Sequence, residues 1–121
     1  MNMKKFVNSF KYAFGGIKET LRQEQNIKIH LFMMILVIIA GIIFRINKIE
    51  WIICIILFGL VISAELFNTA IENVVDLITK EKNINAKIAK DVAAGAVLVS
   101  AIASAVIGLI IFIPKVMDLI N

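Results

Sequence analysis

Acidic and amide side chains recur at regular intervals along one apolar segment of the sequence. The regularly spaced ones are Glu65, Asn68, Thr69, Glu72 and Asp76. At about 100° of helical rotation per residue, all five fall within about 60° of one line along a helix. Ionisable side chains at membrane depth are energetically costly and usually functional. The spacing therefore predicts a functional polar face on a helix embedded in lipid.

Phosphoryl transfer is the chemistry that fits these residue types. Carboxylate and amide oxygens suit Mg²⁺, which proteins usually hold with one or two carboxylates plus substrate phosphates. Lys90, its neighbour Asp91 and the earlier Glu24 are predicted at the same level of the membrane. A lysine supplies a point charge for phosphate oxygens, and a remaining carboxylate can act as base for a hydroxyl nucleophile. The sequence has no GxxxxGK[ST] motif, so any nucleotide must be held in another way.

The composition indicates a small membrane protein with a single domain, residues 1–121. The chain has 121 residues, of which 60% are hydrophobic, and a mean hydropathy of +0.92. Soluble domains are about 45–50% apolar, and a chain this small cannot cover so much apolar surface with a core of its own. Lipid or neighbouring subunits must cover the rest. The net charge of +4 comes from basic residues that flank apolar segments, which favours anionic lipid headgroups over nucleic acid as partners.

Hydrophobic patterning predicts an all-α membrane protein with three transmembrane helices preceded by an N-terminal interfacial amphipathic helix. The amphipathic helix is predicted at 3–22, and the spans at 29–45, 50–78 and 86–113. Phenylalanines on one face of 3–22 and lysines on the other suit a helix that lies in the membrane interface. A helix packed on its own protein is the alternative interpretation of this segment.

Several residues mark the expected ends and bends of these helices. Gly15–Gly16 is expected to bend or interrupt the first helix, and Trp51 to anchor the second span at the headgroup level. Asn85 is expected to cap the third span, and Pro114 to end it. Small residues recur every four positions in that span and would let another helix approach closely; they are Ala96, Ser100, Ser104 and Gly108.

The distribution of basic residues predicts the orientation in the membrane. Six lysines and arginines lie in residues 1–28 and four in residues 80–90, whereas the 45–50 loop carries two and the C-terminal tail one. The positive-inside rule therefore places the N-terminus and the second loop in the cytoplasm and the C-terminus outside. The end of the second span and the start of the third then meet at the cytoplasmic boundary.

The same region carries a specific sequence pattern. Residues 64–76 read Ala-Glu-Leu-Phe-Asn-Thr-Ala-Ile-Glu-Asn-Val-Val-Asp, and Ala89-Lys90-Asp91 follows before a third span rich in small residues. This pattern resembles the prokaryotic diacylglycerol kinase family, which includes the undecaprenol kinases of Gram-positive bacteria, and the resemblance covers nearly the whole chain. It implies an ATP-dependent lipid kinase of the bacterial cytoplasmic membrane. It also implies a homotrimer with composite active sites between adjacent protomers.

The resemblance further implies roles for individual residues. Glu65 would be the catalytic base that activates the lipid hydroxyl. Glu24 and Glu72 would hold Mg²⁺ together with the phosphates of ATP, with Glu19 as the alternative to Glu24. The residues that would support nucleotide binding are Glu24, Asn68, Glu72, Asp76, Lys90 and Asp91.

The expected lipid substrate is undecaprenol, and diacylglycerol is the alternative. The segment before the first span has the form Asn26-x-x-x-His30-Leu31, which resembles the Gram-positive branch of the family. His30 itself is expected to be an interfacial residue rather than a metal ligand. Two alternatives are not kinases. An ion or proton pathway predicts carboxylates spread through the membrane depth, and an accessory membrane subunit leaves the acidic face without a purpose.

Overall fold

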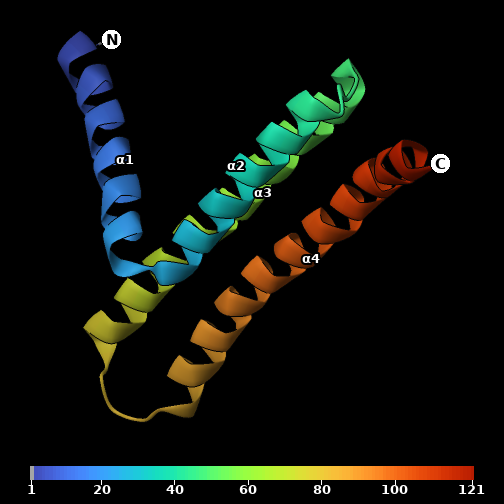
Figure 1. Cartoon of the computed structure of the whole chain (residues 1–121). Coiled ribbons are helices and arrows are strands. Elements are labelled where there is room, and N and C mark those ends of the chain that lie inside the picture. Colours follow the sequence, from blue (N-terminus) through green and yellow to red (C-terminus); the bar gives the residue numbers. More distant parts are fainter. Residues whose placement is uncertain (1) are drawn as a thin grey trace.

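The structure, a computed structural model, describes residues 2–121 and contains four α-helices, with no β-strand in that range. The helices are α1 (Met3–Gln23), α2 (Gln25–Ile43), α3 (Lys48–Ile78) and α4 (Ile84–Ile120). Figure 1 shows α2 and α3 lying side by side, while α4 returns from the loop that follows α3. Because α3 contacts each of the other three helices, it is the element that organises the chain.

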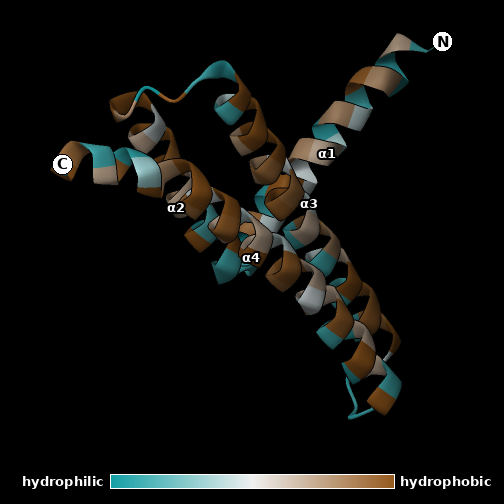
Figure 2. Ribbon diagram, turned by 90° about the vertical axis from the view of Figure 1, so that its right-hand side faces the viewer, coloured by the Kyte–Doolittle hydropathy of each residue, from teal (hydrophilic) through white to brown (hydrophobic). Residues whose placement is uncertain are grey.

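Three of these helices, α2, α3 and α4, are long and apolar enough to cross a membrane, which confirms the predicted number of spans. Hydrophobic residues cover much of the length of all three in Figure 2. Many large apolar side chains point away from the rest of the chain; Phe32 and Leu98 are each 60% exposed. Apolar surface of this extent requires lipid or other subunits to cover it.

A single residue, Glu24, separates α1 from α2. Its backbone is extended, with φ −108° and ψ 126°, and its N–H donates to the Thr20 carbonyl at 2.9 Å. Figure 1 shows the chain changing direction between α1 and α2, so Glu24, the residue that separates them, lies at a corner. The expected bend at Gly15–Gly16 is wrong, because α1 continues through both glycines. A glycine costs a helix only about 1 kcal/mol, which does not break a helix flanked by good formers.

The turn between α2 and α3 closes one end of the bundle. Ile46 N–H donates to the Gly41 carbonyl at 3.1 Å, and Arg45 N–H donates to the Ile42 carbonyl at 3.3 Å. Arg45 has φ 52°, the left-handed conformation that this Schellman-type helix end requires. The indole of Trp51 then packs directly on Gly41, where no side chain intervenes.

A small apolar core lies beside this turn. Ile46, Cys54 and Ile111 are buried, and Trp51 and Phe112 pack partly buried against them. Residues from the start of α3 and the end of α4 meet here, so the core fixes the two helices together at this end. The lone cysteine is buried within the core and serves as one of its apolar side chains.

The first turn of α4 has a different cap from the one expected. The side chain of Asn83, not that of Asn85, caps the helix by accepting from the Asn85 N–H at 2.9 Å and the Ala86 N–H at 3.2 Å. Asn85 is already helical, since α4 begins at Ile84. The loop between α3 and α4 is therefore short.

The last turns of α4 also differ from the sequence prediction. The helix continues through Pro114 to Ile120, so the expectation that Pro114 ends it is wrong. Pro114 has no backbone N–H, so the carbonyl four residues earlier, that of Ile110, loses its helical donor, a loss that transmembrane helices tolerate. In this chain Lys115 Nζ donates to the Ile111 carbonyl at 3.3 Å and to Glu50 Oε2 at 2.8 Å. These contacts hold the post-proline turn against the start of α3.

Candidate active site

The polar face of α3 is buried at its middle and exposed at its C-terminal end. Glu65 is 1% exposed, and Asn68 and Thr69 are also buried. Glu72 is half-buried and Asp76 is exposed. Burying a carboxylate costs free energy unless it is paired or hydrogen-bonded. The depth of Glu65 therefore indicates a functional group rather than a surface charge.

Three buried polar atoms on this face have no hydrogen-bond partner within residues 2–121. They are Glu65 Oε1, Asn68 Oδ1 and Thr69 Oγ1. Nearly all buried polar atoms in native proteins have a partner, so a group of three on one helix face requires an explanation. Polar atoms of a ligand or of bound water would satisfy them.

His30 of α2 approaches Glu65 from the neighbouring helix. The distance from His30 Nε2 to Glu65 Oε1 is 3.2 Å, which is within ion-pair range, although the two groups are not aligned for a full hydrogen bond. Sequence reasoning expected an interfacial residue at this position and missed the contact. This side of α2 is covered in the structure, because Ile27, three residues earlier on the same face of the helix, is fully buried.

Glu24 lies beside Glu72, at the corner between α1 and α2. A hydrogen bond to the Glu72 carboxyl group, partial burial and the negative charges of Glu72 and Glu65 together raise the pKa of Glu24 to about 7. Asn68 Nδ2 donates to Glu72 Oε1 at 3.3 Å. The corner thus brings together two carboxyl groups that repel each other unless a proton or a cation neutralises one of them.

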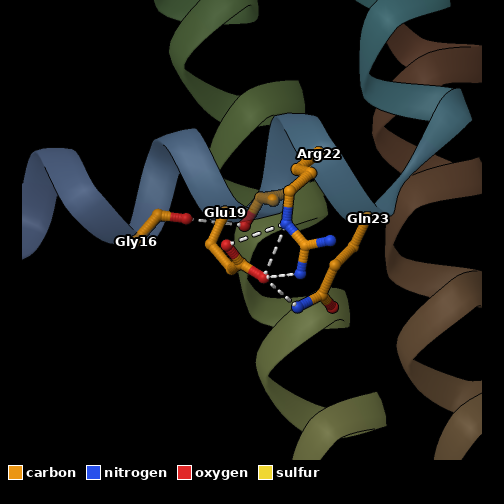
Figure 3. A network of polar contacts seen from close by, with 5 residues as sticks. Gly16, Glu19, Arg22 and Gln23 are labelled. Atoms are coloured by element: carbon orange, nitrogen blue, oxygen red, sulfur yellow. Dashed lines mark hydrogen bonds and ion pairs between the residues drawn. The ribbon is translucent and has the colours of Figure 1, made fainter.

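Glu19, the alternative to Glu24, is engaged elsewhere. Figure 3 shows its carboxylate directed toward Arg22 and Gln23 on the same helix. Gln23 Nε2 donates to Glu19 Oε1 at 3.0 Å, and the Arg22 guanidinium forms an ion pair with the same carboxylate. The hydrogen bonds from Arg22 and Gln23 lower the pKa of Glu19 to about 2. This geometry favours Glu24 over Glu19 as the acidic group of the site.

Lys90 joins the polar face from α4. Its Nζ lies 2.6 Å from Asp76 Oδ1, so the two residues link α3 to α4 near the loop. Asp91, predicted in the same cluster, instead pairs with Lys87 one turn away at 2.6 Å. Asp76, Lys90 and Asp91 nevertheless share one cavity of about 610 Å³, together with lysines 80 and 82 of the loop.

The predicted site therefore has two adjoining parts. Glu24, Glu65, Asn68 and Glu72 lie together where α1, α2 and α3 meet, as the contacts and charge interactions between them indicate. Asp76, Lys90 and Asp91 lie closer to the loop. Lys90 connects the parts, because its charge also acts on Glu72.

The residues present fit a magnesium ion that arrives with a nucleotide. Within residues 2–121, no group of three His, Cys, Asp or Glu side chains is arranged to hold a metal ion by itself. Glu24 and Glu72 provide two carboxylates, and Asn68 provides an unpartnered amide oxygen beside them. Mg²⁺ is commonly bound by one or two carboxylates plus phosphate oxygens and water, and this donor set matches that pattern.

Comparison with known proteins gives the chain its family. Residues 11–112 match the family described as prokaryotic diacylglycerol kinase. The chain is 48% identical over 113 residues to undecaprenol kinase of Bacillus subtilis, a match that covers 93% of this chain and 92% of that protein. It is 38% identical over 112 residues to diacylglycerol kinase of Synechocystis, which covers 92% of this chain and 64% of that protein. The chain belongs to the prokaryotic diacylglycerol kinase family.

Proposed function

We propose that this protein is an integral-membrane lipid kinase that transfers the γ-phosphate of ATP to the hydroxyl of undecaprenol. Family membership and the 48% identity to an undecaprenol kinase support the reaction and the lipid. The observation that carries the proposal is the burial of Glu65 next to the Glu24–Glu72 pair. This arrangement brings a candidate base beside a candidate phosphate site. Diacylglycerol is the alternative lipid, supported by the 38% identity to a diacylglycerol kinase.

Glu65 acts as the general base in this proposal. A base must reach the proton that it abstracts, and it works best when water does not compete for it. Glu65 is 1% exposed, and its Oε1 has no hydrogen-bond partner within the described residues. That oxygen can accept the proton of the lipid hydroxyl as the hydroxyl oxygen attacks the γ-phosphorus. The phosphate–oxygen bond to ADP breaks, and ADP leaves with the electron pair.

Glu24 and Glu72 would hold Mg²⁺ against the triphosphate. When bound, the ion neutralises charge on the phosphate oxygens and on the leaving group. Asn68 fixes the Glu72 carboxylate by its hydrogen bond at 3.3 Å. Lys90, with Asp76 orienting it, supplies a positive charge for the phosphates, and Asp91 lines the same cavity. Glu24, Asn68, Glu72, Asp76, Lys90 and Asp91 thus form the nucleotide side of the proposed site.

The lipid would enter from the side, between α1 and α3. A groove of about 350 Å³ runs between these helices and is lined by Gly16, Leu66 and Thr69, among others. Thr69 has an unpartnered buried hydroxyl, which gives the groove a polar inner end. On α1, Phe6 and Phe10 pack edge to face and remain about half exposed. Exposed aromatic side chains opposite lysines suit a helix in the membrane interface.

The proposed orientation follows the basic residues, with the N-terminus and the site on the cytoplasmic side and the C-terminus outside. ATP then reaches the site from the cytoplasm, whereas the lipid stays in the inner leaflet of the bacterial membrane. We further propose a homotrimer with sites shared between protomers. Exposed apolar faces support association, and so do Gly95 and Gly108 of α4, where an added Cβ would meet nothing within 4 Å.

A kinase assay in mixed detergent–lipid micelles tests the proposal. The purified protein is given radiolabelled ATP with Mg²⁺ and equal amounts of undecaprenol and diacylglycerol. We expect label in undecaprenyl phosphate above label in phosphatidic acid. Glu65→Gln is expected to lower turnover by about a hundredfold to ten-thousandfold, the contribution of a general base. Asp118→Asn, which alters an exposed carboxylate near the C-terminal end of α4, is the matched control and should keep most of the activity.

The same preparation tests the alternatives. Normal turnover by Glu65→Gln would remove Glu65 as the base, and labelling of neither lipid would contradict the kinase proposal. An ion or proton pathway predicts flux across liposomes without ATP. Spans α2 and α4 carry no carboxylate in their middle thirds, so we expect no such flux. An accessory subunit predicts no thermal stabilisation by MgATP, because a ligand stabilises only the state that binds it.

A further inference from the structure

The side chain that comes closest to neutralising Glu65 is His30. Its Nε2 lies 3.2 Å from Glu65 Oε1, and the histidine side chain is 24% exposed against 1% for the glutamate. His30 belongs to α2 and Glu65 to α3, so the contact depends on how these helices are rotated against each other. Neither the family description nor the relatives' names assign a role to this histidine.

The other charged groups around Glu65 oppose its ionised form. Glu72, on the same helix, and Glu24, at the corner between α1 and α2, both interact with it as like charges. On α4 the nearest charged group of the polar face, Lys90, is held by Asp76. Among these neighbours, His30 alone can carry a positive charge within ion-pair distance of Glu65.

We propose that His30 is a positioning residue for Glu65, which holds the carboxylate ionised and aimed at the lipid hydroxyl. This inference rests on the proposed role of Glu65 as the base. An imidazole at 3.2 Å favours the carboxylate through the dipole of its N–H when neutral and through its positive charge when protonated. Without it, burial and two neighbouring carboxylates favour the protonated acid, which cannot accept the substrate proton.

The contact also explains why Glu65 can be buried at this depth. An ionised carboxylate with no partner is costly to bury, and an imidazole at 3.2 Å that can carry a positive charge reduces that cost. The imidazole is partly exposed, so its outer edge can contact water while its Nε2 faces the carboxylate. A ring fixed on this face of α2 also restricts the rotamers that Glu65 can adopt.

Two substitutions separate the charge of His30 from its polar contact with Glu65. His30→Leu removes both, and His30→Gln keeps an amide donor without a positive charge. We expect the acid limb of the kcat profile of His30→Leu to move up by about one pH unit or more, the size of effect that a neighbouring charge has. His30→Gln should fall between the parent and His30→Leu. The KM for MgATP should change little, because Glu24 and Glu72 are untouched.

Lys28→Gln is the matched control. It removes a positive charge two residues away on the same helix, where the side chain is exposed. Its pH profile should match the parent, which would show that a local contact rather than general electrostatics causes the shift. Thermal stabilisation by MgATP verifies that each variant is folded. If His30→Leu does not fold, His30→Gln alone carries the test, because it preserves the polar contact.

A pH profile of His30→Leu or of a folded His30→Gln that coincides with the parent would overturn the inference. The same variants distinguish a failure of the role proposed for His30 from a failure of the role proposed for Glu65. If Glu65→Gln is inactive at every pH while both His30 variants behave as the parent, Glu65 remains the base and His30 has no role. If Glu65→Gln is active, the base assignment fails, and the role of His30 fails with it.

Discussion

Lys90 Nζ lies 2.6 Å from Asp76 Oδ1, and this one ion pair joins the last turn of α3 to the second turn of α4. The residues are 14 positions apart in the sequence, on either side of the loop. Both side chains are 40–50% exposed, and exposed pairs contribute little to stability. The contact instead positions Lys90 at the cavity where the phosphates of the nucleotide are proposed to bind.

This relationship predicts a loss of nucleotide binding without a loss of fold. Lys90→Gln should raise the KM for MgATP by about tenfold or more, because a charge-assisted hydrogen bond to phosphate is lost. Asp76→Asn should raise it as well, because Lys90 then loses the carboxylate that orients it. The thermal midpoint in detergent should stay near the parent value. Steady-state kinetics at varied MgATP concentration, alongside a thermal scan, measures both quantities.

Lys87→Gln is the control for this prediction. Lys87 also lines the cavity but pairs with Asp91 on the same helix and does not link α3 to α4. Its effect on the KM should be smaller than that of Lys90→Gln. Equal effects of the two substitutions would mean that the lysines act only through their summed charge.

The carboxylate pair at the corner predicts that removing either carboxylate affects the stability of the metal-free protein and of the metal-bound protein in opposite ways. Glu24→Gln and Glu72→Gln remove the repulsion between the two groups, so the metal-free protein should melt at the same temperature or higher. Both should lose the stabilisation that Mg²⁺ with a non-hydrolysable ATP analogue gives the parent. A ligand stabilises in proportion to the logarithm of its concentration over Kd, so the loss is visible as a flat titration.

Glu19→Gln gives the matched comparison for the metal titration. Glu19 pairs with Arg22 and Gln23 on α1 and does not face Glu72. Its Mg²⁺ response should equal that of the parent. A Glu19 variant that lost the response while Glu24→Gln kept it would reverse the assignment of the N-terminal ligand.

Local patterns were sufficient to predict the three spans and the polar face of α3. Long apolar runs identify transmembrane helices because of the length and hydrophobicity that a bilayer imposes. That Glu65, Asn68 and Glu72 share one face of α3 follows from helix geometry alone. The burial of Glu65 and Asn68 follows once other helices cover that face, which the sequence pattern leads one to expect.

Features set by the relative rotation of helices could not be read from the sequence. The contact between His30 and Glu65 depends on which face of α2 meets α3. The preference for Glu24 over Glu19 depends on where α1 ends, and that is decided by a single extended residue. The separation of Asp91 from the acidic cluster depends on its pairing with Lys87. The first two are set by how the helices meet, whereas the Lys87–Asp91 pair is an i,i+4 contact that helical spacing alone could have predicted.

Because α4 continues beyond Pro114, we expect the Glu50–Lys115 pair to stabilise the turn that follows the proline. Lys115 Nζ lies 2.8 Å from Glu50 Oε2, and both side chains are largely covered. Lys115→Met should destabilise the post-proline turn and expose it to protease or hydrogen exchange, without changing kinase turnover. Hydrogen exchange followed by mass spectrometry reports on residues 114–120 separately from the rest of α4. Unchanged protection in Lys115→Met would show that the turn is held by packing alone.

Close packing at Gly41 decides whether Gly41→Ala stabilises or destabilises the protein. Alanine normally favours a helix over glycine by about 1 kcal/mol. At Gly41, however, a Cβ would lie 2.6 Å from Trp51 Cη2 and 2.9 Å from Cζ2, so the indole must move. Overpacking of this kind costs about 1–3 kcal/mol. We expect Gly41→Ala to lower the thermal midpoint, and the fluorescence of Trp51, the only tryptophan, to change with it.

Gly59→Ala is the control for this substitution. Gly59 lies within α3, and an added Cβ there meets nothing within 4 Å, so this variant should be as stable as the parent or slightly more so. The pair separates helix propensity, which both substitutions share, from the clash, which only one of them creates. Adding Trp51→Leu to Gly41→Ala should recover part of the lost stability, because a smaller side chain leaves room for the methyl group. Equal thermal midpoints for Gly41→Ala and Gly59→Ala would show that the indole is free to move, and that the turn between α2 and α3 does not depend on this contact.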